Sequence, residues 1–391
     1  MRLKNIVFIF FALILFLRNI INLAKIIYNV KKSNVILFST GGFGHMSTDP
    51  MFLNHLYYKK KKIIIYLSRG KKHNIVLSKC FKNLNIFFIY STINFPFFNI
   101  FYLYNSELIL KNLLNIIFKY LFKNNVFFEN YLDLEKKFID SEAERFNTDI
   151  NNNYLGFISS LKLNNINSSS FFYYNETVKE NIEKKINNFN SFKKNKFINF
   201  YYRKKFTAFN NKLSDENKEV RNGGDIENYF EGFRWLISKN YKILFNGDDN
   251  YFSPKKKIEI KKIFSNSIIF NEDINLSKDE FFVYSVFNSK FFIGNAGGGN
   301  NFHNLLKQPG LLLDYYPYWT TTRNSVIYYK PFINSKNKDI KISKIVNDYK
   351  YITLEDTRKI RDLNSKEILT AIINFYNEYI IKKVNIINTS N

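Results

Sequence analysis

The sequence predicts an α/β protein with two doubly wound domains, each built on a parallel sheet, behind an apolar amino-terminal helix. Short apolar runs of strand length alternate with helical patterns over most of the 391 residues, and this alternation is typical of parallel sheets covered by helices on both faces. The pattern restarts in the middle of the chain, and each half carries a glycine-rich loop between a strand and a helix. With 46% hydrophobic residues, a chain of this length can form two cores.

These patterns divide the chain into four expected parts. An apolar and amphipathic helix covers residues 1–30, a first α/β domain 31–192, a second α/β domain 193–350, and a closing helical segment 351–391. The closing segment has a helical pattern at 365–381, and packing across both domains is one option for it.

The chain is strongly basic, with 58 Lys and Arg against 33 Asp and Glu and a formal charge of +25. Such a charge favours anionic partners, such as phosphorylated substrates or an acidic membrane surface. The basic residues are dispersed, and the heavy use of Lys, Asn, Ile and Phe, which have A/T-rich codons, is typical of a biased genome. No nucleic-acid motif is present, so we expect no nucleic-acid partner. The single cysteine, Cys80, excludes a disulfide framework and a multi-cysteine metal site.

An unbroken apolar run of twelve residues, 6–17, follows two basic residues at the amino end. The run is shorter than the roughly 20 residues of a membrane-spanning helix, and no signal-peptide cleavage site follows it. We expect an uncleaved helix that docks on the cytoplasmic face of the inner membrane, with Lys25, Lys31 and Lys32 near anionic headgroups. Two alternatives stay open: a tilted anchor that also uses residues 20–27, and a helix packed on the protein's own core.

The first half begins with a predicted buried strand at 34–38 that runs into the sequence STGGFGHMSTDP. Asp49 or Thr48 is placed to cap a helix ahead of Pro50. The other predicted elements of this half are strands at 63–67 and 86–90, helices at 73–81, 107–122, 129–146 and 175–190, and a loop-dominated stretch at 147–170.

The loop after the first strand is a candidate site, because ligands of doubly wound sheets bind beyond the carboxyl ends of the strands. A histidine there has a pKa suited to removing a hydroxyl proton near neutrality. The loop contains Gly41, Gly42, Gly44 and His45.

The second half starts with a predicted strand at 196–202, which places Arg203 at its carboxyl end. Apolar residues then recur at helical spacing over 226–237, and the next strand, 241–245, ends in NGDDN. The other predicted elements are a polar insertion at 207–217, helices at 254–264 and 278–287, and a strand at 267–270.

A glycine-rich stretch then follows, with a strand at 290–293, a loop at 294–300, one or two helical turns at 301–307 and a strand at 310–313. Such a loop lets backbone N–H groups approach an anionic ligand, and the next helix adds unpaired donors. The glycines match neither the spaced dinucleotide fingerprint nor the lysine-bearing phosphate loop, so we do not expect hydride transfer. A tight connection without a ligand is the alternative.

Four segments in order resemble a family of bacterial glycosyltransferases of the GT-B fold associated with surface-glycan synthesis. They are GFGHMSTDP, FYYR, VRNGGDIENYFEGFRWLISKNYKILFNGDD and SKFFIGNAGGGNNFHNLLKQPGLLLD, and the resemblance spans residues 34–314. It implies two Rossmann-like domains that face each other across a cleft, with the acceptor in 31–192 and a nucleotide-sugar donor in 193–350. The chain has AGGG where the family typically has a serine-containing loop, which puts a hydroxyl role there in doubt.

Residue roles follow from this resemblance. The Arg203 guanidinium can hold two phosphate oxygens, and the glycine loop would bring backbone donors to the phosphates or the ribose. The expected donor-binding residues are Arg203, Arg221, Asn222, Asp248, Asp249, Asn295, Gly297, Gly298, Gly299 and Asn300. We expect His45 to act as the base, with Asp49 as the alternative, and Gly41, Gly42 and Gly44 to form the acceptor loop. The resemblance also implies a reaction without a metal ion or a cofactor.

Two rival functions stay open. A nucleotide-sugar 2-epimerase uses the same two-domain fold without an acceptor, although the apolar amino terminus counts against it. A basic binding protein for nucleic acid or anionic glycan, without catalysis, is the second rival, and salt-sensitive binding without turnover would favour it.

Overall fold

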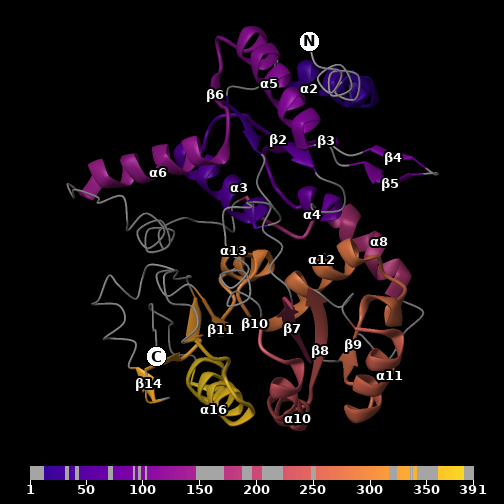
Figure 1. Cartoon of the computed structure of the whole chain (residues 1–391), viewed down its shortest axis with the longest axis vertical. Helices are drawn as coiled ribbons and strands as arrows, with labels where there is room; N and C mark the ends of the chain where they lie inside the picture. Colours follow the sequence, from indigo (N-terminus) through magenta and orange to yellow (C-terminus); the bar gives the residue numbers. More distant parts are fainter. Residues whose placement is uncertain are drawn as a thin grey trace. The chain divides into compact units, whose positions relative to one another are not determined.

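The computed structural model describes residues 13–30, 35–39, 44–68, 74–90, 93–95, 98–101, 104–146, 171–186, 196–204, 223–247, 252–316, 324–334, 336, 338–340 and 360–382. The chain divides into two compact units: residues 1–148 with 166–173, and residues 149–165 with 174–391. Both are α/β units on parallel sheets, which confirms the predicted fold class (Figure 1). The cleft between domains stays a prediction.

The first unit contains a four-stranded parallel sheet in the order β3-β2-β1-β6. Its strands are β1 (Val35–Ser39), β2 (Lys62–Ser68), β3 (Leu84–Tyr90) and β6 (Val126–Phe128). The sequence reading had not included β6, because its three residues are too few for a periodic pattern. A separate antiparallel pair joins β4 (Ile93–Phe95) to β5 (Phe98–Phe101).

Helices cover both faces of this sheet (Figure 1). On one face, α2 (Ile20–Val30) and α5 (Tyr104–Leu121) pack on alternate strand residues such as Ile36 and Ile63. On the other lie α3 (His45–Leu56) and α6 (Tyr131–Phe146), joined by the stacked rings of Phe52 and Phe138 at 4.5 Å. The short helix α4 (Ile75–Ser78) begins where the Asn74 side chain accepts a hydrogen bond from the Leu77 amide.

The amino-terminal helix packs on the first unit. Residues 13–18 are helical, and Leu15 joins Leu23 and Ile26 of α2 in the core cluster. In the part of the chain that the structure describes, no helix is long and apolar enough to cross a membrane. The expectation of an apolar amino-terminal helix docked on a membrane is corrected in its described part, which follows the alternative of packing on the protein's own core. Its buried side is apolar except for Asn19, whose side chain donates to the carbonyl oxygens of Leu15 and Tyr90.

The second unit contains a six-stranded parallel sheet in the order β12-β11-β10-β7-β8-β9. Numbered from β7, this is the strand order 6-5-4-1-2-3 of a doubly wound dinucleotide fold. The strands are β7 (Lys196–Tyr202), β8 (Tyr241–Gly247), β9 (Ile268–Ile269), β10 (Ser289–Gly294), β11 (Gly310–Tyr315) and β12 (Ser325–Tyr329). The sequence analysis does not predict β12.

The larger core of this unit lies under η4 (Ile226–Tyr229), α10 (Phe230–Ser238), α11 (Pro254–Ile263) and α16 (Ser365–Phe375). In that core, Phe200 of β7 meets Phe233 of α10 edge to face at 4.8 Å. The opposite face carries α12 (Lys278–Asn288) and α13 (Phe302–Leu305). Helix α8 (Glu176–Ile186) contacts α12. The remaining elements are the 3₁₀ helices η6 (Asn271–Ile274) and η7 (Gly298–Asn301), the π-helix η9 (Tyr376–Ile381), and the antiparallel pair β13 (Phe332–Ile333) and β14 (Asp339–Ile340).

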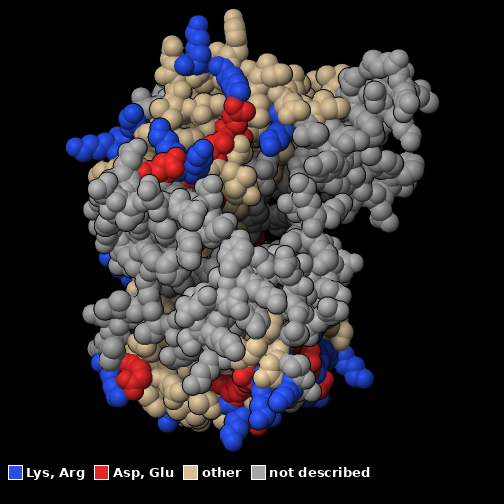
Figure 2. Space-filling view, turned by 60° about the vertical axis from the view of Figure 1, so that its left-hand side comes forward, with Lys and Arg blue, Asp and Glu red and all other residues tan. Residues whose placement is uncertain are grey.

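Described Lys and Arg side chains project from both units on the face shown in Figure 2, with Asp and Glu among them. Ion pairs between described side chains include Lys185 with Glu280 and Lys257 with Glu272, both at 2.7 Å. The charge of the described surface is therefore mixed on this face, as the dispersed pattern in the sequence predicts.

Candidate active site

The first unit places a histidine and an aspartate side by side at the carboxyl edge of its sheet. Helix α3 begins at His45, with Gly44 as its N-cap residue, so Asp49 lies one turn further on the same face. The His45 Nδ1 lies 3.1 Å from the Asp49 Oδ1. The predicted start of the helix near Pro50 was wrong, since Pro50 and Asp49 both lie inside it. The pairing depends on this earlier start.

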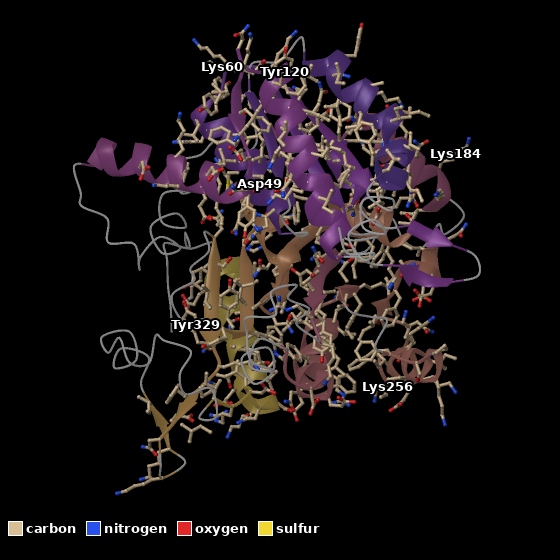
Figure 3. All side chains as sticks on the ribbon, turned by 45° about the horizontal axis from the view of Figure 1, so that its top comes forward. Asp49, Lys60, Tyr120, Lys184, Lys256 and Tyr329 are labelled. Atoms are coloured by element: carbon tan, nitrogen blue, oxygen red, sulfur yellow. The ribbon has the colours of Figure 1, made fainter. Side chains whose placement is uncertain are left out.

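Asp49 is 1% exposed, and its second oxygen accepts a hydrogen bond from the Ser39 hydroxyl at 2.8 Å. The Tyr66 hydroxyl donates to the His45 carbonyl at 3.0 Å. Figure 3 shows Asp49 in the interior of the unit and Lys60 at its outer surface. Because a carboxylate accepts hydrogen bonds, the Nδ1 of His45 donates to Asp49, and Nε2 is then the acceptor nitrogen of the neutral ring.

The His45 side chain is 30% exposed and lies against the first turn of α6. Its ring centroid is 4.0 Å from that of Tyr131. Burial lowers the pKa of His45, but the hydrogen bond and negative charge of Asp49, with a smaller effect of Glu135, raise it above 6.5 overall. Burial raises the pKa of Glu135, although the charge of His45 opposes this. His45 therefore keeps a bound proton to a higher pH than an ordinary histidine does.

This group lies at the topological switch point of the first sheet. Strands β1 and β6 are neighbours, and the chain leaves β1 toward α3 and β6 toward α6. Ligands of doubly wound sheets bind beyond the carboxyl ends of the strands at such a point; here α3 and α6, which follow the two strands, pack together on one face of the sheet.

The second unit has its own switch point between β7 and β10, which are also neighbours. Here Asn295 joins the two strand ends. Its side-chain Oδ1 accepts a hydrogen bond from the backbone N–H of Arg203 at 2.9 Å, and its backbone N–H donates to the carbonyl oxygen of Tyr201 at 3.2 Å. The Gly223 amide donates to the Arg203 carbonyl at 2.7 Å. The backbone that carries the Arg203 guanidinium is therefore held from both sides.

The glycine loop lies on the ring of Tyr201. A Cβ added to Gly297 would lie 2.6 Å from this ring, and one added to Gly299 would overlap it. At Gly294 an added Cβ would lie 2.5 Å from the Tyr201 carbonyl oxygen. These glycines are therefore required by close approach, and the bare backbone continues into the helical turns η7 and α13.

Tyr315, at the end of β11, connects this loop to the arginine. Burial raises its pKa to about 12, while a hydrogen bond with the Asn300 side chain and the positive charge of Arg203 act in the opposite direction. Arg203 and Asn300 therefore lie near one tyrosine hydroxyl. A cation, an amide and bare backbone together are suited to an anionic group.

His303 and Asp314 are buried, and their contacts stabilise the fold of the second unit. His303 is buried, stacks on Phe292 at 4.6 Å and shares a 2.7 Å hydrogen bond with the Ser325 hydroxyl. Asp314 accepts hydrogen bonds from the Tyr229 hydroxyl at 2.9 Å and from the Leu363 amide at 2.7 Å, so it fixes the segment before α16.

Several expected site residues lie outside the described residues: Gly41, Gly42, Arg221, Asn222, Asp248 and Asp249. The structure does describe Gly44, His45, Asp49, Arg203, Asn295 and the loop 297–300. It brings the first three together in one unit and the others together in the second. Within the described residues, no group of three or more His, Cys, Asp or Glu side chains is arranged to hold a metal ion.

Sequence reasoning missed the residues that surround these side chains. They are Ser39, Tyr66, Tyr131 and Glu135 in the first unit and Tyr201 and Tyr315 in the second. A usable signal was present for three of them, because Ser39, Tyr201 and Tyr315 stand at or next to the last residue of a strand.

No family model and no curated protein sequence matches the chain. Among solved structures, a glycosyl transferase family 9 protein from Veillonella parvula is similar over 88% of this chain and 98% of its own, with 10% identity and a TM-score of 0.46. The E. coli ADP-heptose LPS heptosyltransferase II is similar over 89% and 99%, with 11% identity and a TM-score of 0.44. A UDP-GlcNAc 2-epimerase from Neisseria meningitidis, bound to UDP-GlcNAc, is similar over 89% and 100%, with 14% identity and a TM-score of 0.36.

Proposed function

We propose that the protein is a glycosyltransferase that moves a sugar from a nucleotide-sugar donor to a glycan or lipid-linked acceptor, in a metal-independent reaction. The observation that carries the proposal is the His45–Asp49 pair at the switch point of the first sheet, with one imidazole nitrogen held by a buried carboxylate. A partly exposed, oriented imidazole is the arrangement expected of a general base. The alternative, Asp49 as the base, is disfavoured because Ser39 and His45 already occupy its two oxygens.

The second unit supplies the donor side of the proposal. Departure of a nucleoside diphosphate requires stabilisation of negative charge. The guanidinium of Arg203 would hold phosphate oxygens, and the backbone N–H groups of the glycine loop would bind the same anion. Support comes from Asn295 and Gly223, which fix the backbone of Arg203, and from the position of Asn300 and Tyr315 beside it.

In the proposed reaction, neutral His45 removes the proton of the acceptor hydroxyl. The oxygen of an acceptor hydroxyl forms a bond to the anomeric carbon of the donor sugar, while the bond from that carbon to the diphosphate oxygen breaks. The electron pair leaves with the nucleoside diphosphate, and the hydroxyl proton moves to the Nε2 of His45. The Asp49 carboxylate orients the ring through Nδ1 and stabilises the imidazolium that results.

We also propose that the protein works on the surface of an anionic membrane, at the cytoplasmic face. The amino-terminal helical segment buries one side in the first unit and exposes a second apolar side at helical spacing. Leu13, Leu17 and Ile21 of this side are 54%, 55% and 67% exposed. Arg18 and Lys25 are exposed on the same segment, which suits anionic headgroups.

The membrane proposal is tested by co-sedimentation with phosphatidylglycerol vesicles and with phosphatidylcholine vesicles. We expect binding to the first kind that Ile21→Glu abolishes, since a charge would enter the apolar contact. A matched control is Ile258→Glu on α11, at an isoleucine that is 55% exposed in the second unit. Equal loss in both variants would contradict the proposal.

The function itself is tested by thermal shift against UDP, GDP, ADP, CMP and dTDP, followed by turnover of the matching nucleotide-sugar. We expect one nucleotide to raise the melting temperature selectively, and Arg203→Ala to remove this response. The exposed Arg234 on α10 provides the control variant, Arg234→Ala. An unchanged response in Arg203→Ala would remove Arg203 from the donor site.

Turnover then separates the rivals. Release of nucleoside diphosphate that depends on an added acceptor supports transfer. Interconversion of a nucleotide-sugar with its 2-epimer, without an acceptor, would support the epimerase instead. Salt-sensitive binding of polyanions without any turnover would support the binding protein.

A further inference from the structure

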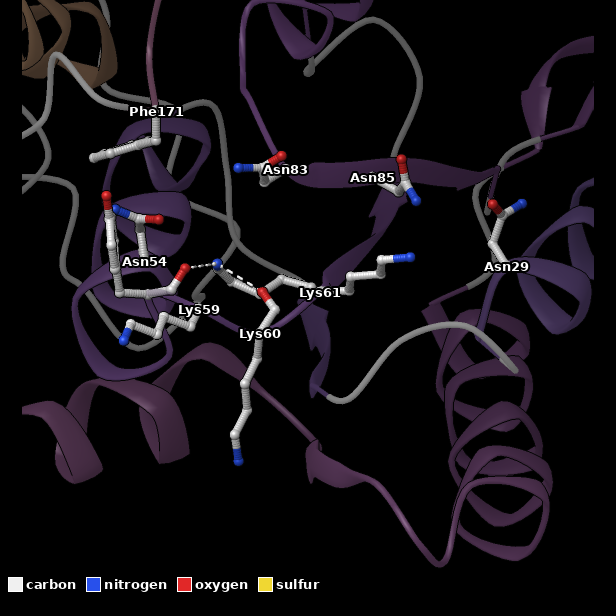
Figure 4. A pocket seen from close by; sticks show the side chains of 10 residues that line it. Asn29, Asn54, Lys59, Lys60, Lys61, Asn83, Asn85 and Phe171 are labelled. Atoms are coloured by element: carbon white, nitrogen blue, oxygen red, sulfur yellow. Dashed lines mark hydrogen bonds between the residues drawn. The ribbon is translucent and has the colours of Figure 1, made fainter.

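The first unit also has a pocket at the opposite edge of its sheet from His45. Lys62, the first residue of β2, pairs in register with Leu84, the first residue of β3, and the pocket lies at these amino ends. Its volume is about 600 Å³, which falls in the range of small-molecule sites. Figure 4 shows Lys61 extended beneath Asn83 and Asn85, with Asn29 beyond it. The proposed transfer reaction uses none of these residues.

The pocket is positively charged. Four successive lysines, 59–62, line it, and its lining contains no Asp or Glu among the described residues. Lys62 is only 3% exposed, and its ammonium group donates to the carbonyl oxygens of Tyr58 at 3.3 Å and Lys60 at 2.9 Å. Burial lowers its pKa. An ammonium group has three donors, and in the described part of the chain no carboxylate forms an ion pair with Lys62.

The rest of the lining is suited to hydroxyl groups. Four asparagines contribute amides that can both donate and accept: Asn29, Asn54, Asn83 and Asn85. Phe171 and Tyr58 add aromatic surface. Cationic donors together with amides and aromatic rings are complementary to a ligand that carries both an anionic group and several hydroxyls.

We propose that this pocket is a second, non-catalytic site that binds a polyol or sugar bearing a phosphate group. The phosphate would lie near the ammonium groups of Lys61 and Lys62, and the hydroxyls would contact Asn83 and Asn85. Such a group occurs in free sugar phosphates and in the headgroups of phosphoinositide lipids, and both share this chemistry.

The test is calorimetric titration of the full chain with glucose 6-phosphate, with glucose and inorganic phosphate as partial ligands. We expect glucose 6-phosphate to bind, and Asn85→Asp to weaken binding about tenfold, because a carboxylate would lie near the phosphate. Asn85 and Lys61 are exposed, so these substitutions leave the core unchanged. Lys61→Gln should weaken binding by a similar factor.

Two control variants separate this site from general charge and from the proposed donor site. Lys60 lies in the same run, but its side chain extends away from Asn83 and Asn85 and lies over the Tyr57 ring at 5.5 Å. Lys60→Gln removes the same charge and should leave the affinity within about twofold. Arg203→Ala should also leave it unchanged, because that residue belongs to the second unit.

A parallel titration uses phosphatidylcholine vesicles containing phosphatidylinositol 4-phosphate. Vesicle binding that Asn85→Asp weakens would support the site with a lipid headgroup as the source of the phosphate. Absence of binding in both titrations would overturn the proposal. Equal weakening by Lys60→Gln and Lys61→Gln would overturn it too, since the interaction would then be a diffuse charge effect.

Discussion

Two histidines that follow glycine-containing loops have opposite surroundings. His45 in the first unit keeps 30% of its side chain exposed and pairs with Asp49, and its pKa is raised. His303 in the second unit is 1% exposed between Phe292 and Ser325, and burial lowers its pKa to about 3. The surroundings of His45, a buried carboxylate and solvent, therefore suit the proposed proton transfer, whereas those of His303 suit packing.

The largest effect on activity is expected for substitution of His45. We expect His45→Gln to lower kcat of the proposed transfer by about 10²–10⁴, the usual contribution of a general base, with nucleotide binding and melting temperature retained. Steady-state kinetics and thermal shift on the same preparation check this. An equal loss of kcat in His303→Gln, with the fold intact, would contradict the assignment of His45 to catalysis and His303 to packing.

The next effect concerns Asp49. We expect Asp49→Asn to lower kcat on the order of 10²-fold, since the ring would lose the partner that orients it. The wild-type rate should fall as pH drops through a pKa above 6.5, because protonated His45 cannot accept a proton. Asp49→Asn removes the negative charge that helps to raise this pKa, so the acid limb should move to lower pH. A pH profile of kcat/KM measures the shift, and a limb that stays in place would exclude His45 as the titrating base.

The packing of His303 is tested through Gly310. A Cβ added there would lie 2.7 Å from the Cδ2 of His303. The His303 ring has little room to move away, because Phe292 stacks on it. We expect Gly310→Ala to lower the free energy of unfolding by about 1–3 kcal/mol. Gly232→Ala on α10 is the matched control, since its Cβ would come too close only to the flexible end of Ile372, and its contact with Ile368 at 3.8 Å is an ordinary one. Denaturant titration of both variants should show a loss only at Gly310.

The smallest effect is a pH slope. Since the folded pKa of His303 is about 3 and the unfolded value is 6.5, the unfolded state binds one more proton between these values. The stability that this group contributes is fully present above pH 6.5 and decreases as pH falls toward 3. The slope is at most about 1.4 kcal/mol per pH unit. We expect His303→Gln to flatten the stability curve between pH 6 and about 4, as measured by denaturant unfolding. An unchanged slope would mean that His303 is not held neutral.

Much of the fold could be predicted because strand and glycine signals are local. The apolar runs at β1, β2, β7, β8, β10 and β11 were recognised within a few residues, since each is long enough to show its pattern. Strands β6 and β12 were missed. Of the candidate site, Arg203, Asn295 and the glycine loop could be predicted because they directly follow strands.

Two α/β halves, a bare loop in the second half and a histidine after the first strand follow from local patterns along the chain. The early start of α3, which pairs His45 with Asp49, follows from the packing of the folded chain. This packing also brought Tyr131 to His45 and Tyr315 to Asn300, from elements far apart in the chain. The physical reason is that hydrophobic periodicity is set by neighbours in sequence, whereas strand order and helix starts depend on long-range packing that no local pattern records.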